Sequence, residues 1–300
     1  MRSSFPVTRT GCAAACVLVA AVVVAGCSGT FTGGGTPAAR ALPSTSPTQP
    51  TYSGMVDIGE GRLYLECRGA GSPTVVFESG DESDTTGWRK VLPVVSRATK
   101  ACVYDRLGNG RSTPPTQGCR TLVHLRGDLE SLLRAARIEP PYVLVGTSGG
   151  GYLVGGYALA HPEDVAGMVI ADTFPAIDVE TLPPEVREEI ACGHPSNQEH
   201  RDFATVEHEV WDHRRQIGDI PLTLVTNDYS DLVGASAEQR TSVEGQAGWL
   251  VLSPRGRQVV VTTGHEVPEN EPDLLSREIL AVVDAARQGW RTSPPTGPST

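Results

Sequence analysis

The segment PYVLVGTSGGGYLVGGYALAHP, residues 141–162, constrains the fold more than any other part of this 300-residue chain. Four apolar or aromatic residues, 142–145, lead almost directly into Ser148, which has glycines on both sides. Such an apolar run is typical of a buried strand, and the small residues after it favour a helix. The segment therefore predicts a strand, a sharp turn with Ser148 at its tip, and a helix.

Short β-branched runs alternate with longer amphipathic stretches along the rest of the chain. The runs expected to form strands are 62–69, 74–80, 100–105, 141–147, 165–172, 221–226 and 257–264. Between two of them, residues 121–138 carry leucines at steps of three and four, the pattern of an amphipathic helix. Alternating strands and helices predict an α/β fold whose mostly parallel sheet has helices on both faces.

One acidic, helix-forming segment, at about 173–219, interrupts this alternation. It is too long for a simple connection between two strands and too polar to form a second core. Ligands of open parallel sheets bind beyond the carboxyl ends of the strands. The segment is therefore predicted to form a short helical cap over that edge of the sheet.

The beginning of the chain reads as an export signal. Two arginines precede an apolar run from about residue 12 to residue 25, which is short of the roughly 20 residues that a membrane-spanning helix needs. The run ends in VAGC, which resembles the lipobox of bacterial lipoproteins. This resemblance implies a signal peptide over 1–26 and a lipid anchor on Cys27, which would hold an exported protein on the outer face of the cell membrane. Ordinary secretion with cleavage nearby is the alternative.

Composition separates the domain from its flanks. Residues 27–52 and 291–300 are rich in Ser, Thr, Gly and Pro, and are expected to be a disordered tether and a disordered tail. The remaining residues, 53–290, are predicted to form one domain. The formal net charge of the chain is −10 and no basic run interrupts it, which argues against a nucleic-acid partner.

The GTSGG sequence around Ser148 matches a turn that presents a nucleophile between a strand and a helix. The glycines prevent collisions in the turn, and the N–H groups at the start of the helix can support negative charge on a substrate oxygen. A serine hydroxyl needs a base to take its proton. His265 stands at the end of the last predicted strand and is the candidate for that base.

The base in turn needs a carboxylate that holds its tautomer and stabilises its cation. Asp228 follows the strand predicted at 221–226 and is the preferred candidate. Asp231, slightly further along, and Asp172, at the end of the strand at 165–172, remain alternatives.

A zinc site is not expected in the HEVWDH segment of the cap. The zinc-binding HExxH pattern puts two histidines four residues apart on one helix face. His208 and His213 are five residues apart, about 140° around a helix, so they diverge. No metal and no organic cofactor is implied.

Over residues 53–290 the chain resembles the α/β-hydrolase fold serine hydrolases of the esterase and lipase type. The resemblance is carried by GTSGG, by the GH at 264–265 and by YDRLGNGRS at 104–112, which is similar to the DRxGxGxS loop of the family. The segment 71–88 stands where the family has its HG oxyanion loop, but here the histidine is replaced. The resemblance implies that the backbone amides of Gly149 and Asp81 form the oxyanion hole.

The resemblance also bears on the cysteines, because four of them lie within the predicted domain. An exported protein in an oxidising compartment is expected to form disulfides. In the strand order of the family, Cys67 and Cys102 lie on neighbouring strands, where they could bond or simply pack. Cys119 and Cys192 both lie above the active-site edge, which implies a disulfide between them.

The expected function is an extracytoplasmic serine hydrolase that cleaves carboxylic esters through Ser148, His265 and Asp228. Its partner is a small-molecule ester, and membrane contact is expected through the lipid anchor alone. A peptidase or amidase with the same residues, acting on a short peptide, is one alternative. A binding lipoprotein that kept the fold and lost activity is another. Epoxide and haloalkane hydrolysis are disfavoured, because relatives with those activities carry an aspartate at the position of Ser148.

Overall fold

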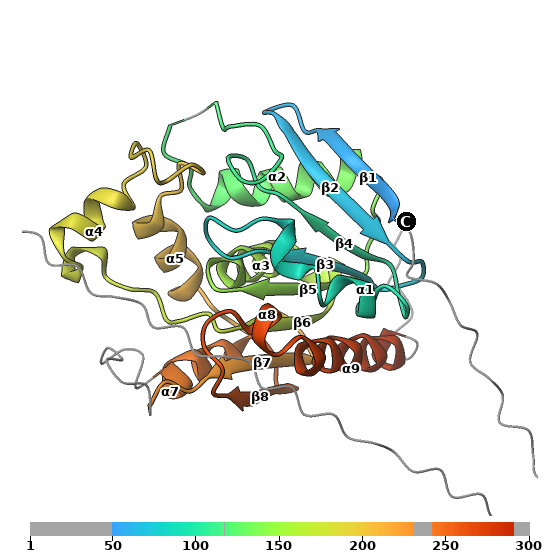
Figure 1. Ribbon diagram of the computed structural model, residues 1–300. Helices are drawn as coiled ribbons and strands as arrows, with labels where there is room; N and C mark the ends of the chain where they lie inside the picture. The colour runs from blue at the N-terminus through green and yellow to red at the C-terminus, as the bar shows by residue number, and fades with distance from the viewer. Residues whose placement is uncertain (1–49, 117, 231–241, 291–300) are drawn as a thin grey trace, which may run out of the picture. The chain divides into compact units, whose positions relative to one another are not determined.

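The fold is built on one sheet of eight strands, in a computed structural model that describes residues 50–116, 118–230 and 242–290 (Figure 1). In chain order the strands are β1 (Pro50–Asp57), β2 (Arg62–Arg68), β3 (Thr74–Glu78), β4 (Ala101–Tyr104), β5 (Tyr142–Thr147), β6 (Val165–Ala171), β7 (Leu222–Asn227) and β8 (Gly256–Val261). Their order across the sheet is β1-β2-β4-β3-β5-β6-β7-β8. The strands from β4 to β8 pair in parallel, whereas β1 and β2 run antiparallel to their neighbours.

Helices cover both faces of this sheet, as the sequence predicted. The longer α-helices are α2 (Leu122–Ala135), α3 (Gly149–Ala160), α5 (Phe203–Trp211) and α9 (Pro272–Trp290). The shorter ones are α1 (Leu92–Val95), α4 (Pro184–Glu189), α7 (Ser242–Gln246) and α8 (Val267–Asn270). The 3-10 helices are η1 (Thr85–Trp88), η2 (Pro162–Asp164), η3 (Val179–Thr181) and η4 (Ala247–Leu252).

Alternating side chains of the strands feed two separate hydrophobic cores. In β3, Val76 packs with residues of α2 and α3, whereas Val75 and Phe77 pack with residues of α1 and α9. Each central strand is therefore buried on both faces, which is why its sequence is continuously apolar. Packing in the two cores fixes where each strand ends. It therefore also fixes the positions of the loops at the carboxyl edge of the sheet.

The sequence does not predict the first strand of the sheet, because its first expected strand is 62–69. Strand β1 begins at Pro50, so residues 50–52 belong to the sheet and not to the tether. The composition of this stretch is that of a linker, but pairing with β2 supplies backbone hydrogen bonds that composition cannot reveal. The predicted signal peptide, Cys27, the rest of the tether up to residue 49, and the tail from 291 lie outside the described residues.

The predicted cap contains η3, α4 and α5, between the end of β6 and the start of β7. The part of the cap around residues 199–201 contacts loops at the carboxyl edge of the sheet. Arg201 forms a backbone bridge with Arg120, and the Glu199 carboxylate pairs with the Arg106 guanidinium in the loop after β4. In helix α5, Val210 packs near Gly155 of α3. The cap is thus attached to the sheet domain by polar contacts at one end and by apolar packing at the other.

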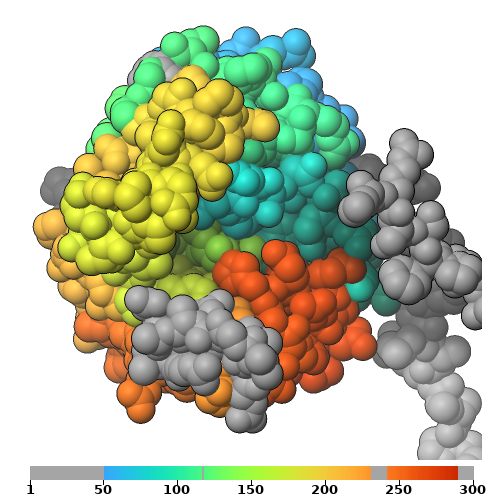
Figure 2. Space-filling model, turned by 60° about the vertical axis from the view of Figure 1, so that its left-hand side comes forward, coloured from blue at the N-terminus to red at the C-terminus, as the bar shows by residue number. Residues whose placement is uncertain are grey.

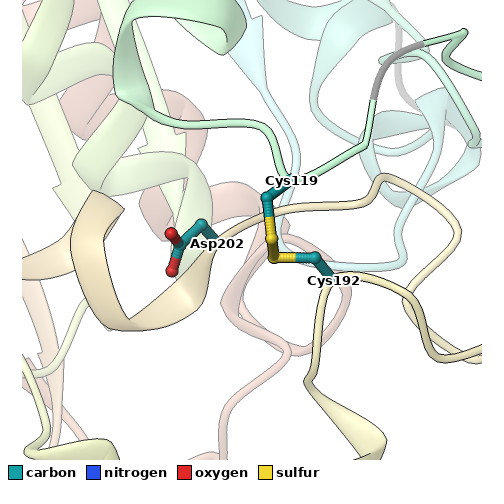
Figure 3. Close-up of side chains that lie close together, drawn as sticks. All are labelled: Cys119, Cys192 and Asp202. Atoms are coloured by element: carbon teal, nitrogen blue, oxygen red, sulfur yellow. A yellow bond between two sulfur atoms is a disulfide. The ribbon is translucent and has the colours of Figure 1, made fainter.

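Two disulfides join the described parts of the chain. Cys67 of β2 and Cys102 of β4 are direct partners across an antiparallel pair and are bonded to each other. Cys119, just before α2, is bonded to Cys192 of the cap (Figure 3). Cys192 lies nine residues before Arg201, so the Cys119–Cys192 bond holds this part of the cap against the rest of the domain.

Within the described ranges, no helix combines the length and the hydropathy required to cross a bilayer.

Breaking the Cys119–Cys192 disulfide is expected to destabilise the folded state. The bond spans 73 residues, and closing a loop of that length stabilises the fold by about 4 kcal/mol in the chain-entropy model. The double variant Cys119→Ser/Cys192→Ser should lower the free energy of unfolding by roughly this amount, measured by urea denaturation. The matched control is the oxidised wild type, because a reductant would also break the Cys67–Cys102 bond. Equal stability of variant and oxidised wild type would contradict the prediction.

Candidate active site

Ser148 stands at the tip of the turn between β5 and α3, as predicted. Its backbone has φ of 51° and ψ of −130°, a conformation that a residue with a side chain rarely adopts. The chain reverses within this single residue, so the hydroxyl projects from the carboxyl edge of the sheet. Because Gly149 is the first residue of α3, its N–H has no acceptor inside the helix and faces the region of the serine.

Glycine is required around Ser148 because backbone from other segments approaches closely. A Cβ on Gly146 would lie 2.6 Å from the carbonyl oxygen of Gly150. A Cβ on Gly150 would lie 2.5 Å from the carbonyl oxygen of Ser79, in the loop after β3. Any side chain at either position would push the turn away from its neighbours, so the pattern GxSxG follows from this packing.

His265 lies in the loop between β8 and α8 and reaches Ser148 with its ring. Its Nε2 is 2.9 Å from the Ser148 Oγ. The loop is held by Asn227 at the end of β7, whose Oδ1 accepts hydrogen bonds from the N–H groups of Thr263 and Gly264, at 2.8 and 2.9 Å. The structure therefore brings together the serine and the histidine that the sequence singled out, 117 residues apart.

The carboxylate beside the histidine is Asp172, which corrects the preference for Asp228. The His265 Nδ1 donates to the Asp172 Oδ2 at 2.7 Å, and the Asp172 side chain is fully buried. The Asp228 carboxylate instead accepts from the N–H of Ser230, two residues further on, at 2.8 Å. That local turn directs Asp228 away from the histidine. The remaining alternative, Asp231, lies outside the described residues.

The position of Asp172 explains why distance along the chain misled the sequence prediction. It follows β6, which lies next to β5 in the sheet, so Asp172 ends beside the strand that carries Ser148. Its N–H donates to the carbonyl of Val225 in β7, and its φ of 44° turns the chain sharply. At the end of β7 it is instead the Asn227 side chain that points toward the loop that carries His265.

Three further groups hold the Asp172 carboxylate. The Gln246 Nε2 donates to its Oδ1 at 2.8 Å, the N–H of Asn227 donates to the same oxygen at 3.2 Å, and the Tyr229 hydroxyl donates to its Oδ2. These donors stabilise a negative charge that burial would otherwise disfavour. No sequence pattern marks Asn227, Tyr229 or Gln246 in advance, because each acquires its role only through a contact across the fold.

Hydrogen bonding to Asp172 raises the pKa of His265 above its ordinary value, and burial only partly opposes this effect. The carboxylate stabilises the protonated imidazole. The ring of Phe174, from the start of the cap, stacks on the imidazole with ring centroids 6.0 Å apart. His265 is thus oriented on one edge by Asp172 and on one face by an aromatic ring.

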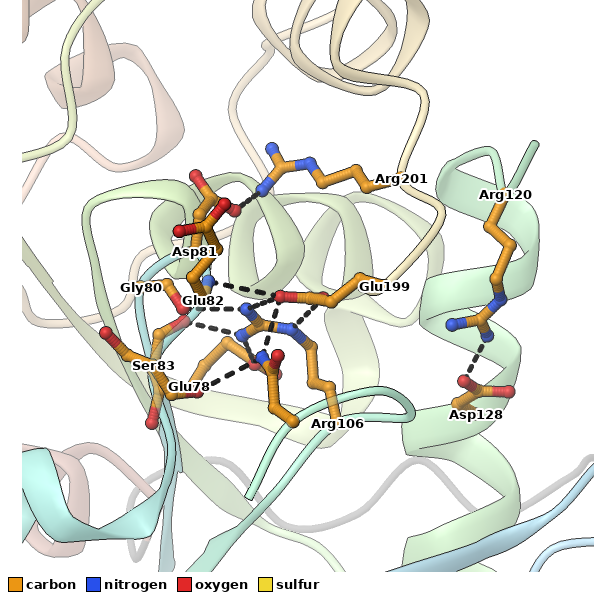
Figure 4. A network of polar contacts seen from close by, with 12 residues as sticks. Glu78, Gly80, Asp81, Glu82, Ser83, Arg106, Arg120, Asp128, Glu199 and Arg201 are labelled. Atoms are coloured by element: carbon orange, nitrogen blue, oxygen red, sulfur yellow. Dashed lines mark hydrogen bonds and ion pairs between the residues drawn. The ribbon is translucent and has the colours of Figure 1, made fainter. Parts of the chain in front are cut away.

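The loop after β3 lies directly against Ser148. A Cβ on Gly80 would be 3.2 Å from the Ser148 Cβ and 3.8 Å from its Oγ. The Arg106 guanidinium donates to the carbonyl oxygens of Ser79 and Gly80, at 2.6 and 2.7 Å (Figure 4). The Gly80–Asp81 peptide is not among the cis bonds of the described chain. In a trans peptide the C=O and the N–H point in opposite directions, so the Asp81 N–H points away from Arg106.

A small hollow opens beside these groups. Its volume is about 90 Å³, and its lining includes Gly80, Trp88, Ser148 and His265. In Figure 2 the segment around His265 (red), the loop after β3 (cyan) and the cap (yellow) meet on one face of the molecule. Ligand sites for drug-sized molecules have volumes of about 300–1,000 Å³, so the space bordered by these residues suits a small group.

One group of residues in the described chain has the spacing of metal ligands: Cys119, Cys192 and Asp202 (Figure 3). The two sulfur atoms are bonded to each other. Metal ions bind cysteine as the thiolate, so this group in its disulfide form does not offer a metal site.

A family model described as the alpha/beta hydrolase fold matches residues 73–228, just over half of the chain. The protein YqjL of Bacillus subtilis is 26% identical over 74% of this chain and 87% of its own length. A putative carbamate hydrolase, RutD of Yersinia enterocolitica, is 31% identical over 40% of this chain and 44% of its own length. Apart from YqjL, the chain spans less than half the length of the first curated relatives that it matches.

Solved structures share the same architecture. A putative alpha/beta hydrolase from Nostoc sp. PCC 7120, ALR0039, superposes with a TM-score of 0.62 at 16% identity, over 77% of this chain and 97% of that one. At this identity the likeness concerns the fold alone. The family match and the shared architecture agree with the strand order found here, and the chain belongs to the alpha/beta hydrolase fold family.

Proposed function

We propose that this protein is a serine hydrolase that cleaves small carboxylic esters through a covalent acyl-enzyme. The observation that carries the proposal is the continuous hydrogen-bonded chain from Ser148 through His265 to the buried Asp172. Nucleophile, base and orienting carboxylate in this arrangement are the groups that acyl transfer requires. Hydrolases are found among the relatives, which supports hydrolysis as the type of reaction.

The first half of the proposed reaction forms the acyl-enzyme. The Ser148 Oγ attacks the ester carbonyl while the His265 Nε2 takes its proton, and Asp172 stabilises the resulting imidazolium. The carbonyl oxygen gains negative charge as the tetrahedral intermediate forms. The N–H groups of Gly149 and Asp81 are the proposed donors to this oxygen. When the intermediate collapses, His265 gives its proton to the departing alcohol.

The second half releases the acid. Water takes the place of the alcohol, His265 removes a proton from it, and the hydroxide attacks the acyl carbonyl. A second tetrahedral intermediate is stabilised by the same two N–H groups. It collapses to a carboxylic acid and free Ser148, which recovers its proton from His265. Apart from the ester and water, every group named in the cycle is a side chain or an N–H of this chain.

Export and lipid anchoring remain proposals that the disulfides support. Disulfides persist in oxidising compartments and are rare in the cytosol. The bonds Cys67–Cys102 and Cys119–Cys192 therefore favour a location outside the cytoplasm. Attachment through Cys27 rests on the sequence of the leader alone.

The nucleophile can be tested with p-nitrophenyl esters from acetate to palmitate. Wild-type protein is expected to turn over the short esters fastest, because the hollow beside Ser148 has a volume of only about 90 Å³. The Ser148→Ala variant should lose at least about 10⁴-fold in kcat, since the attacking atom is removed. Equal turnover by the two folded proteins would refute the proposal, and faster turnover of palmitate would refute the short-chain preference.

The identity of the carboxylate can be tested by matched amide variants. Asp172→Asn should lower kcat by about 10⁴-fold, because it removes the negative charge beside His265 and favours the wrong tautomer. Asp228→Asn should stay within about 2-fold of wild type, since its carboxylate serves only a local turn. Initial rates with p-nitrophenyl acetate measure both effects. A large loss in Asp228→Asn alone would reverse the assignment.

The pH dependence follows from the raised pKa of His265. The base must be neutral to accept a proton, so kcat/KM should rise with pH as His265 deprotonates. The midpoint should lie above the ordinary histidine pKa of about 6.5. In Asp172→Asn the residual activity should rise at a lower pH, because the stabilising charge is gone. An unchanged midpoint in that variant would contradict the assigned cause.

A further inference from the structure

A carboxylate stands where the proposed reaction develops negative charge. The Asp81 side chain lies against the Cα of Gly149, and a Cβ built on Gly149 would overlap its carboxylate oxygens. The N–H groups of these same two residues are the proposed donors to the substrate oxygen. An uncompensated negative charge so close would oppose the charge that forms on that oxygen.

One residue of the cap supplies the compensating charge. The Arg201 Nη1 forms an ion pair with the Asp81 Oδ1 across 120 residues of sequence (Figure 4). The Arg201 side chain is 1% exposed and that of Asp81 is 26% exposed. Interactions between opposite charges strengthen as water is excluded. The pair therefore opposes the field that Asp81 would otherwise exert at the amide of Gly149.

The backbone of Arg201 is fixed independently of its side chain. Its N–H donates to the Asn197 Oδ1 at 3.0 Å, and its carbonyl accepts from the Asn197 Nδ2 at 2.8 Å. It also pairs with Arg120 in a backbone bridge. A substitution of the Arg201 side chain can therefore remove the charge while these backbone contacts remain.

Asp81 is the main counterion of this guanidinium. Two other carboxylates lie nearby. Glu199 is paired with Arg106, and Glu207 lies 3.7 Å from the Arg201 Nη2, where burial raises its pKa to about 7. Glu207 thus carries only part of a charge near neutral pH. Among the described residues, the Arg201 Nε and Nη2 have no hydrogen-bond partner. Such an arrangement is costly for stability, which indicates that the charge itself has a use.

We infer that Arg201 is a positioning residue of the oxyanion site, which acts by neutralising and holding the Asp81 carboxylate beside the amide of Gly149. The inference rests on the proposed function and adds a part played by the cap. Arg106 fixes the carbonyl side of the Gly80–Asp81 peptide, and Arg201 fixes the side chain that follows it. Together they orient the Asp81 N–H and neutralise the Asp81 carboxylate, whose charge would oppose the negative charge on the substrate oxygen.

The inference predicts a specific rescue. In Arg201→Met the Asp81 carboxylate loses its ion-pair partner, and kcat for p-nitrophenyl acetate should fall about 10²-fold with KM nearly unchanged, similar to losing one oxyanion donor. Asp81→Asn removes the charge that needs balancing and should stay within about 10-fold of wild type. The double variant Asp81→Asn/Arg201→Met should recover to about the level of Asp81→Asn.

A purely structural role for Arg201 would give a different result. In that case the double variant would be as slow as Arg201→Met or slower, because removing Asp81 cannot repair a displaced cap, and the inference would be overturned. Circular dichroism and thermal unfolding establish that each variant is folded. If Arg201→Met does not fold, Arg201→Gln with and without Asp81→Asn provides the same comparison, with the same two outcomes.

A second readout separates this inference from the proposed function. A fluorophosphonate transfers its phosphonyl group to the Ser148 Oγ and loses fluoride. The phosphonyl oxygen then occupies the oxyanion site, so this probe does not depend on the identity of the natural substrate. Labelling of wild type but not of Ser148→Ala supports the nucleophile, and labelling rates across the four Arg201 and Asp81 proteins should follow the same rescue. No labelling of wild type would refute the proposed function and the inference with it. Normal labelling without rescue would refute the inference alone.

Discussion

The strained backbone at Ser148 is the constraint on which the rest of the site depends. A positive φ at a residue with a side chain costs of the order of 1–3 kcal/mol and persists only where the surroundings enforce it. Here β5 is buried between β3 and β6, and α3 packs on the sheet, so both arms of the turn are fixed. The start of α3 leaves room only for glycine at position 146, and the backbone at the end of β3 and just after it leaves room only for glycine at position 150. Strand packing thus determines where the serine hydroxyl stands.

Buried charges form the second layer of organisation. Arg106 pairs with Glu78 and with Glu199 of the cap while it donates to backbone carbonyls of the loop after β3. Removing one partner of such a buried set leaves an uncompensated charge, which is strongly destabilising. The set therefore favours a single arrangement of loop and cap. Arg201 extends the same principle to Asp81, at the point where the proposed chemistry takes place.

Much of this could be predicted from the sequence, because strands buried on both faces have a distinctive pattern. The sheet, the covering helices, the cap and the turn at Ser148 all followed from local runs of residues. Strand β1 did not, since its first residues have the composition of a linker and the strand joins the sheet only by pairing with β2. The carboxylate was also misassigned. Asp228 is close to a strand end in sequence, but a local hydrogen bond from Ser230 turns it away.

The sequence by itself determined the nucleophile candidate and its base, because a glycine-bounded serine after an apolar strand and a histidine after the last strand are local patterns. Only the tertiary structure decided which carboxylate meets His265 and which cation meets Asp81. These partners lie 93 and 120 residues away. Their meeting depends on the order of strands in the sheet and on how the cap is attached. No short stretch of residues encodes a contact between partners so far apart in the chain, so these contacts can be identified only in the folded structure.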